Sequence, residues 1–188
     1  MIKYAICGNI ASGKSEVERI LARMGYKILD TDEVAHNLLH EKSDIIKKEF
    51  EGFDISENDK ICRKKLGKIV FSDKKLKEKL ENILHPLIKI KIEKFFIDNE
   101  NEEKVFVAIR LLFESGMQDL FDKIIFIYTD DRIRLKRLIL RDNYNEEYAK
   151  IRMNSQISQD EKVLKSDIII YNNSSLEDLE REIRDLVL

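Results

Sequence analysis

Residues 8–15 of this chain read Gly-Asn-Ile-Ala-Ser-Gly-Lys-Ser and match the phosphate-binding pattern G-x-x-x-x-G-K-[ST] at every fixed position. The pattern constrains the fold because such a loop works between a buried strand and the start of a helix. Residues 2–7 are rich in apolar and β-branched side chains, and residues 16–24 place four apolar side chains on one helical stripe. We therefore predict a strand, a phosphate loop (residues 8–15) and a helix, and we expect the chain to bind a nucleotide.

The phosphate loop assigns chemical roles to its own residues. Lys14 is predicted to reach the β- and γ-phosphates of ATP and to act in catalysis, and the Ser15 hydroxyl is predicted to bind Mg²⁺. Asn172 follows the last strand-like run and is expected to line the adenine pocket. The predicted nucleotide-binding residues are Gly8, Asn9, Ile10, Ala11, Ser12, Gly13, Lys14, Ser15, Glu16 and Asn172.

Composition limits the other classes of function. The 188 residues are 43% hydrophobic and 37% charged, as in a globular protein, and a formal net charge of −2 gives no support to nucleic-acid or membrane binding. Cys7 and Cys62 offer neither a disulfide framework nor metal-ligand spacing, and Cys7 is expected to pack as a small apolar residue. We expect a cytoplasmic protein without a membrane span or a nucleic-acid partner; composition leaves its oligomeric state open.

Strand-like and helix-like segments alternate along the chain. The expected strands are 2–7, 26–29, 105–112, 124–128 and 167–171; the expected helices are 16–24, one from about 31, a charged region 45–96 broken near 52–58, then 132–141, 145–159 and a last helix after a capping box at 174–178. The alternation predicts an α/β fold, a three-layer phosphate-loop NTPase fold with a mostly parallel sheet. Ligands of such sheets bind at the carboxyl ends of the strands, where Gly8 and Asp32 both fall.

Two carboxylates, Asp30 and Asp32, follow the second expected strand. Phosphoryl transfer needs positioning and charge compensation, so one carboxylate aligned with the attacking hydroxyl is sufficient as a base. We predict that Asp32 is this catalytic residue and that Asp30 holds water around Mg²⁺. The alternative is that Thr31 or Asp32 only caps the following helix.

Three arginines, Arg137, Arg141 and Arg152, flank the polar turn at residues 142–145. Arg137 and Arg141 share a helix face, because they stand four residues apart. A mobile helical lid would bring them over the phosphates, where they would neutralise charge in the transition state. A solvated basic helix face is the commoner origin of such a pattern and remains an alternative.

Several ordered segments together give the chain a family resemblance. They are the phosphate loop, Leu29-Asp-Thr-Asp32 with Ala35, Arg63-x-x-Leu66 with Val70-Phe71, Leu84-His-Pro-Leu-Ile88, Leu111-Leu-Phe-Glu114, Arg137-x-x-x-Arg141, Arg152-x-x-x-Gln156 and Asp167-Ile-Ile-Ile-Tyr-Asn172. In this order they resemble the dephospho-coenzyme A kinase family along nearly the whole chain. The resemblance implies transfer of a phosphoryl group from ATP to the ribose 3′-hydroxyl of dephospho-coenzyme A, the last step of coenzyme A synthesis.

The resemblance also implies an organisation and an acceptor site. It implies one kinase domain, with a core at about 1–57, 98–131 and 158–188, a helical acceptor-binding subdomain at about 58–97 and a lid at about 132–157. The implied acceptor-binding residues are Asp32, Arg63, His85, Leu112 and Arg152. From chemistry alone His85, before the only proline, favours a structural histidine. The cluster Arg63, Lys64, Lys65 and Lys68 suits either a diphosphate or a solvated helix face.

The chain departs from the family pattern at several positions. Asn9 and Ala11 stand where glycine is usual, and we expect Ala11 to be tolerated if its backbone stays at negative φ. Glu16 and Cys7 replace threonine, Arg110 replaces proline and His36 replaces arginine. A kinase for another small acceptor, or a nucleotide-binding switch without transfer chemistry, stays open; the absence of an Asn-Lys-x-Asp segment speaks against a GTPase.

Overall fold

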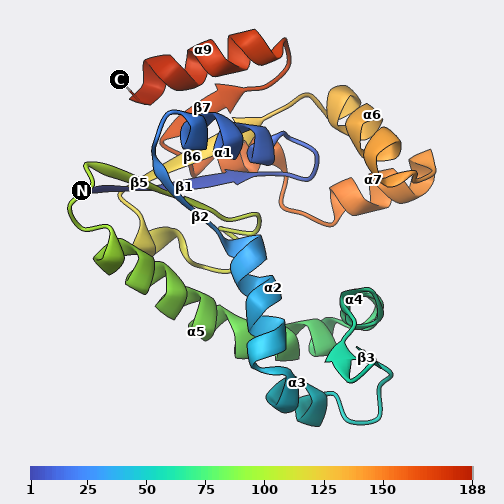
Figure 1. Ribbon diagram of the computed structural model, residues 1–188. Coiled ribbons are helices and arrows are strands. Elements are labelled where there is room, and N and C mark those ends of the chain that lie inside the picture. The colour runs from blue at the N-terminus through green and yellow to red at the C-terminus, as the bar shows by residue number, and fades with distance from the viewer. Residues whose placement is uncertain (188) are drawn as a thin grey trace. The chain divides into compact units, whose positions relative to one another are not determined.

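Five strands form the central sheet of the first compact unit, which comprises residues 1–30 and the chain from residue 96 onward (Figure 1). The computed structural model describes residues 1–187. In sheet order the strands are β2 (Lys27–Asp30), β5 (Lys104–Ala108), β1 (Ile2–Gly8), β6 (Lys123–Tyr128) and β7 (Ile168–Tyr171). Every neighbouring pair is parallel, which confirms the predicted sheet.

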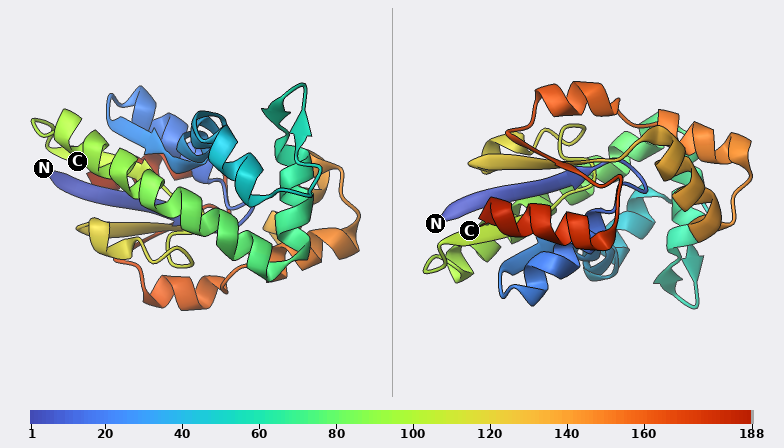
Figure 2. Two further views of the ribbon diagram at one scale, coloured as in Figure 1. Left: turned by 90° about the horizontal axis from the view of Figure 1, so that it is seen from below. Right: turned by 90° about the horizontal axis from the view of Figure 1, so that it is seen from above.

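The helices α1 (Lys14–Arg23) and α9 (Leu176–Val187) pack against each other and against the sheet (Figure 2). Their contact is apolar because both helices repeat apolar residues at helical spacing. The buried cluster comprises Ile6, Val17, Ile20, Leu21, Phe106, Ile125, Ile127, Ile170, Leu179, Ile183 and Val187. The predicted capping box is present at the start of α9, where the backbone N–H of Asp178 donates to Ser175 Oγ at 3.2 Å. Leu176, the first residue of α9, is exposed.

The strand expected at 105–112 is shorter than predicted. It ends at Ala108, and residues 110–116 form turns that lead to the short 3₁₀ helix η1 (Gln118–Leu120). Leu112 is fully buried within these turns, and its carbonyl accepts a hydrogen bond from Met117 N. A run of apolar residues indicates burial, but it does not distinguish a strand from a buried turn.

The helix expected at 145–159 is two helices. The first of them, α7 (Glu146–Asn154), follows α6 (Asp131–Asp142) and ends before Gln156. A separate helix, α8 (Gln159–Leu164), begins three residues after Gln156. Ser158 is the N-cap of α8, because its side chain accepts a hydrogen bond from Glu161 N. The apolar periodicity of residues 145–159 therefore did not indicate the boundary between α7 and α8, which the cap at Ser158 marks.

The second compact unit comprises residues 31–95. It contains α2 (Thr31–Glu41), α3 (Ser43–Glu49), the antiparallel pair β3 (Ser56–Glu57) and β4 (Lys60–Ile61), α4 (Arg63–Ser72) and most of α5 (Lys74–Asp98). The expected break near 52–58 is real, and a hairpin with Asn58 and Asp59 at positive φ follows it. Pro86, expected to start or bend a helix, lies inside α5 and does not start it.

No helix within residues 1–187 is long and apolar enough to cross a membrane.

Candidate functional site

The phosphate loop connects β1 to α1 and needs both of its fixed glycines. Gly13, the N-cap of α1, has φ +95°, and a Cβ there would clash with Asn172 Nδ2. A Cβ on Gly8 would clash with Ser12 Oγ and lie 3.2 Å from Ile127 Cβ. The backbone therefore folds tightly between the sheet and the helix N-terminus, the geometry that presents N–H groups to an anion.

Ala11 has φ +64°, so the condition of a negative φ, under which we expect alanine to be tolerated, is not met. The loop must reverse direction within a few residues, and the left-handed conformation at Ala11 belongs to that reversal. For a residue with a Cβ this conformation costs roughly 1–2 kcal/mol. The chain thus carries strain at a position where the resembling family usually has glycine.

Buried polar side chains hold the Ser12 carbonyl. It accepts hydrogen bonds from Asn172 Nδ2 at 2.8 Å and from Thr129 Oγ1 at 2.9 Å. The Asn172 side chain thus holds the loop, and its carbonyl accepts from Arg137 Nη2 at 3.2 Å. The adenine contact, expected through the backbone of residues 172–174, stays a prediction. Thr129 was not singled out from the sequence, although it follows β6 at the carboxyl edge of the sheet.

Both backbone polar groups of Ile10 form hydrogen bonds with side chains. Its N–H donates to Gln156 Oε1 at 2.7 Å, and its carbonyl accepts from Arg134 Nε at 3.0 Å. Asn9 Nδ2 donates to the Ile157 carbonyl at 2.9 Å. The segment between α7 and α8 is therefore bound directly to the phosphate loop, and the Ile10 N–H is already satisfied.

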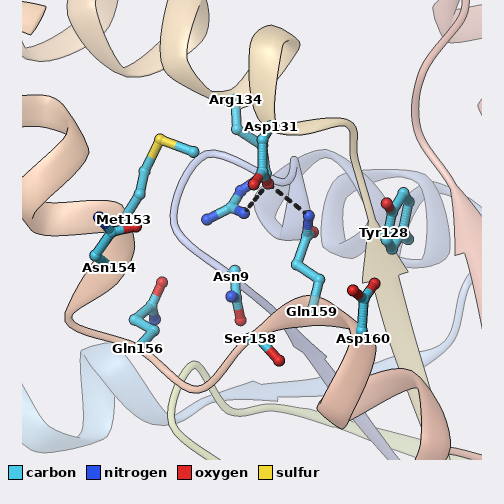
Figure 3. Close-up of a pocket in the computed structure, with 10 residues that line it drawn as sticks. All are labelled: Asn9, Tyr128, Asp131, Arg134, Met153, Asn154, Gln156, Ser158, Gln159 and Asp160. Atoms are coloured by element: carbon cyan, nitrogen blue, oxygen red, sulfur yellow. Dashed lines mark hydrogen bonds and ion pairs between the residues drawn. The ribbon is translucent and has the colours of Figure 1, made fainter.

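A pocket of about 420 Å³ lies on this side of the loop (Figure 3). Its lining residues are Asn9, Tyr128, Asp131, Arg134, Met153, Asn154, Gln156, Ser158, Gln159 and Asp160. Asp131 Oδ1 accepts from Arg134 Nη1 at 2.7 Å and from Gln159 Nε2 at 2.9 Å, as the dashed lines in Figure 3 show. Burial lowers the pKa of Arg134, which Asp131 partly offsets.

Lys14, on the first turn of α1, lies between two carboxylates. Its Nζ is 2.7 Å from Glu18 Oε1, one turn further along the helix, and 4.0 Å from Asp30 Oδ1 at the end of β2. Ser15, the predicted Mg²⁺ ligand, is exposed beside it. Glu16 forms an ion pair with Arg19 on the same helix. The structure thus brings Lys14 and Asp30 together and adds Glu18, which sequence reasoning did not single out.

The two arginines of α6 differ in their surroundings. Arg137 is half-buried near Gly13, and its Nη1 has no hydrogen-bond partner within residues 1–187. Burial lowers the pKa of Arg137. Arg141 instead makes two hydrogen bonds of 2.8 Å to Asp142. Arg137 therefore offers an unused buried donor beside the loop, a feature that an anionic ligand would satisfy.

The Asp142 carboxylate interacts with three arginines, Arg141, Arg152 and Arg110. Its pKa is lowered first by the hydrogen bond from Arg141 and also by the charges of Arg152 and Arg110. Arg110, one of the departures from the family pattern, is therefore near the predicted lid residues Arg141 and Arg152. One carboxylate therefore faces three cations and offsets only part of their positive charge.

The remaining predicted residues lie mostly in the second unit. Asp32 is the second residue of α2, Arg63 is the first residue of α4 and His85 lies within α5. Thr31 and Asp32 lie inside α2, so neither is the residue before the helix. His36 stacks edge-to-face on His40, with ring centroids 4.9 Å apart. The acceptor-binding roles of Asp32, Arg63, His85, Leu112 and Arg152 remain predictions.

Behind the phosphate loop, Cys7 and Lys162 are buried, and Lys162 pairs with the partly exposed Glu114. The Cys7 side chain is almost fully buried, as expected, and desolvation raises the pKa of its thiol to about 12. Lys162 is completely buried, with Nζ 2.7 Å from Glu114 Oε1. Glu114 belongs to the Leu-Leu-Phe-Glu segment, and its carboxylate compensates the buried charge of Lys162 and accepts from Ile157 N, which is consistent with a structural role.

Comparisons with known proteins show the family to which this chain belongs. Residues 2–178 match the family model described as dephospho-CoA kinase. A dephospho-CoA kinase of Fusobacterium nucleatum is 38% identical over 180 residues, covering 95% of this chain and 93% of the relative. The solved dephospho-CoA kinase of Campylobacter jejuni superposes with a TM-score of 0.76 at 38% identity, over 98% of this chain and 94% of that one. A shikimate kinase of Bacteroides thetaiotaomicron, 12% identical with a TM-score of 0.52 over 98% of this chain and 95% of its own, shares the fold.

Proposed function

Since this chain belongs to the dephospho-CoA kinase family, we propose that it transfers the γ-phosphoryl group of ATP to the ribose 3′-hydroxyl of dephospho-coenzyme A. The products are ADP and coenzyme A. The observation that carries the proposal is the phosphate loop with Lys14 at its helix end and the unused buried donor of Arg137 beside Gly13. These groups form an anion site of the kind that phosphoryl transfer requires.

Each group of the site has a distinct task in this proposal. The backbone of the phosphate loop and the N-terminus of α1 bind the β- and γ-phosphates, and Lys14 neutralises their charge as the bond to the γ-phosphorus breaks. Arg137 adds a second cation near Gly13. Arg141 joins them only after it leaves Asp142, so its contribution depends on movement of the α6–α7 lid.

The residues at the start of α1 and at the end of β2 fit a magnesium ion. Mg²⁺ prefers oxygen ligands and usually keeps several waters, with one or two protein oxygens and substrate phosphates. Ser15 supplies a hydroxyl, and the Asp30 carboxylate lies 4.0 Å from Lys14. Mg²⁺ bound with ATP neutralises phosphate charge, while Ser15 would bind it and Asp30 would hold its water.

The acceptor hydroxyl needs a base, and we assign this role to Asp32. It lies two residues after Asp30, in the first turn of α2. Arg63, at the start of α4, His85, Arg152 and Leu112 are the proposed acceptor contacts. The thiols of Cys7 and Cys62 are both free, which supports work in a reducing cytoplasm.

The test is an assay of purified protein with Mg-ATP and a set of acceptors. Dephospho-coenzyme A should give ADP and a new phosphomonoester, detected together by mass spectrometry and ³¹P NMR. Shikimate, AMP and water are the comparison acceptors, and Lys14→Ala protein is the matched control. Faster transfer to another acceptor would replace the assigned substrate, and ADP formation without any acceptor would identify an ATPase.

A further inference from the structure

Residues 9–12 of the phosphate loop form a tight turn with an unfavourable residue in it. The backbone N–H of Ser12 donates to the Asn9 carbonyl at 3.0 Å and closes the turn over Ile10 and Ala11. Ala11 has φ +64°, whereas the φ of Ile10 is not positive. Among hydrogen-bonded turns this pair of signs belongs to type II, which requires glycine or asparagine at the position of Ala11. An alanine at this position therefore favours a different turn.

The competing conformation is a type I turn, in which both central residues have negative φ. The two turn types share the closing hydrogen bond from Ser12 to Asn9, so this bond does not select between them. They differ in the peptide unit between Ile10 and Ala11, which is turned over by roughly half a rotation. Because the C=O and N–H of a trans peptide point in opposite directions, this change would put the Ile10 carbonyl oxygen where the Ala11 N–H now points.

One side chain holds the peptide unit that decides the turn type. Arg134 Nε donates a hydrogen bond of 3.0 Å to the Ile10 carbonyl, which belongs to this unit. The hydrogen bond from Ile10 N to Gln156 belongs to the preceding peptide unit, and those to the Ser12 carbonyl belong to a later one. Since a guanidinium is a stronger hydrogen-bond donor than a neutral group, Arg134 opposes the preference of the alanine.

Arg134 is itself fixed in place. Its side chain is 2% exposed, and its backbone N–H donates to the Asp130 carbonyl at 3.0 Å in the first turn of α6. Its Nη1 donates to Asp131 Oδ1 at 2.7 Å, and the same oxygen accepts from Gln159 Nε2 at 2.9 Å (Figure 3). A donor held in this way loses little conformational entropy when it binds the loop.

We propose that Arg134 is a positioning residue that holds the Ile10–Ala11 peptide unit in the orientation in which the phosphate loop binds a nucleotide. The proposal rests on the proposed function, because it takes the N–H groups of the loop to face the phosphates. With the peptide unit turned over, a carbonyl oxygen would replace one of these donors and repel the phosphates. Without Arg134, positive φ at Ala11 is disfavoured about tenfold, so about one loop in ten would remain competent to bind.

The test is a double-mutant cycle of Arg134→Met and Ala11→Gly, with Mg-ADP binding measured by calorimetry so that no turnover is needed. Arg134→Met should weaken binding about tenfold in the natural sequence, but only about twofold in the Ala11→Gly background, because glycine adopts positive φ freely. Arg134→Gln places an amide nitrogen at the position of Nε and should recover most of the lost affinity. The same losses in both backgrounds, or equal losses for methionine and glutamine, would overturn the proposal.

Urea denaturation of the same four proteins gives a readout that needs no nucleotide. Ala11→Gly should stabilise the natural sequence but not Arg134→Met, because the loop without Arg134 relaxes by turning the peptide unit over; an equal gain in both would contradict the proposal. If Arg134→Met does not fold, Arg134→Lys, which moves the donor, takes its place in the cycle. Arg132→Met, at an exposed position of α6, is the matched control and should change neither measurement. Wild-type protein that binds no Mg-ADP would overturn the proposed function, and the urea cycle would still decide whether Arg134 sets the turn.

Discussion

The phosphate loop and the basic helix α4 are both predicted to meet phosphate groups, yet the protein holds them differently. The loop is held through its backbone by buried side chains, as at the Ser12 carbonyl, which accepts from Thr129 and Asn172. On α4 the Lys65 Nζ forms an ion pair of 2.9 Å with the exposed Asp54 and donates a hydrogen bond of 2.9 Å to the Ser56 carbonyl. The γ-phosphate must be positioned within a fraction of an ångström, whereas charges that attract a flexible acceptor tolerate movement.

The largest effect should come from the lysine of the loop. Lys14→Ala should abolish transfer and weaken ATP binding, because the β- and γ-phosphate charge loses its fixed counter-ion. Lys14→Arg should be nearly as damaging, since a planar guanidinium does not occupy the place of an ammonium. Steady-state kinetics and calorimetry measure both. Activity within about threefold of wild type in either variant would contradict the assignment of the phosphate site.

The lid arginines should have the next largest effect. Arg137→Ala and Arg141→Ala should lower kcat by ~10³ and weaken dephospho-coenzyme A binding much less, because charge-compensating arginines act in the transition state. Asp142→Asn, which frees Arg141 from its carboxylate partner, is an informative companion variant. If the arginine variants lose only acceptor affinity, both residues belong to the acceptor site.

The two aspartates test whether the base lies on β2 or on α2. Asp32→Asn keeps the size of the side chain but removes its charge, so kcat should fall by ~10² while ATP affinity stays similar. Asp30→Asn should instead raise the Mg²⁺ concentration needed for half-maximal rate. Titrations of Mg²⁺ and acceptor on each variant make the distinction. A large kcat loss in Asp30→Asn with normal turnover in Asp32→Asn would reverse the two roles.

The contrast between the loop and α4 predicts unequal stability effects. Thr129 is completely buried, so Thr129→Val should destabilise the protein by about 1–3 kcal/mol, because the Ser12 carbonyl loses a buried donor. Asp54→Asn is the comparison, because it removes only the exposed partner of Lys65 and should leave the melting temperature nearly unchanged. Thermal denaturation of both variants is the measurement. Equal losses of stability in the two variants would contradict the proposed difference between the phosphate loop and α4.

The smallest effect should be a gain in stability from a substitution at Ala11. Ala11 has φ +64°, so Ala11→Gly should relieve backbone strain and raise the free energy of unfolding by about 1 kcal/mol. Chemical denaturation measures this change, and ATP affinity shows whether the strain also shapes the binding site. Glycine at this position that destabilises the protein would show that the loop accommodates alanine without strain.

Local sequence determined much of this protein. The glycine spacing of residues 8–15, with an apolar strand before it and a helix stripe after it, was enough to predict the phosphate loop and the α/β sheet, because these features depend on near neighbours. The ordered segments from Leu29 to Asn172 were enough for the family. The boundaries at Ala108 and Ser155–Ser158 were missed, since apolar periodicity does not register a buried turn or a serine cap.

Only the tertiary structure decided how the loop is held and what surrounds its lysine. Thr129, Gln156 and Asn172 stand more than a hundred residues from the loop, so no local pattern could pair them with Ser12 or Ile10. Glu18 is close in sequence, but an acidic residue on a helix is ordinary until its partner is known. Its significance arises because the fold buries the Glu18–Lys14 pair and brings the end of β2, with Asp30, beside it.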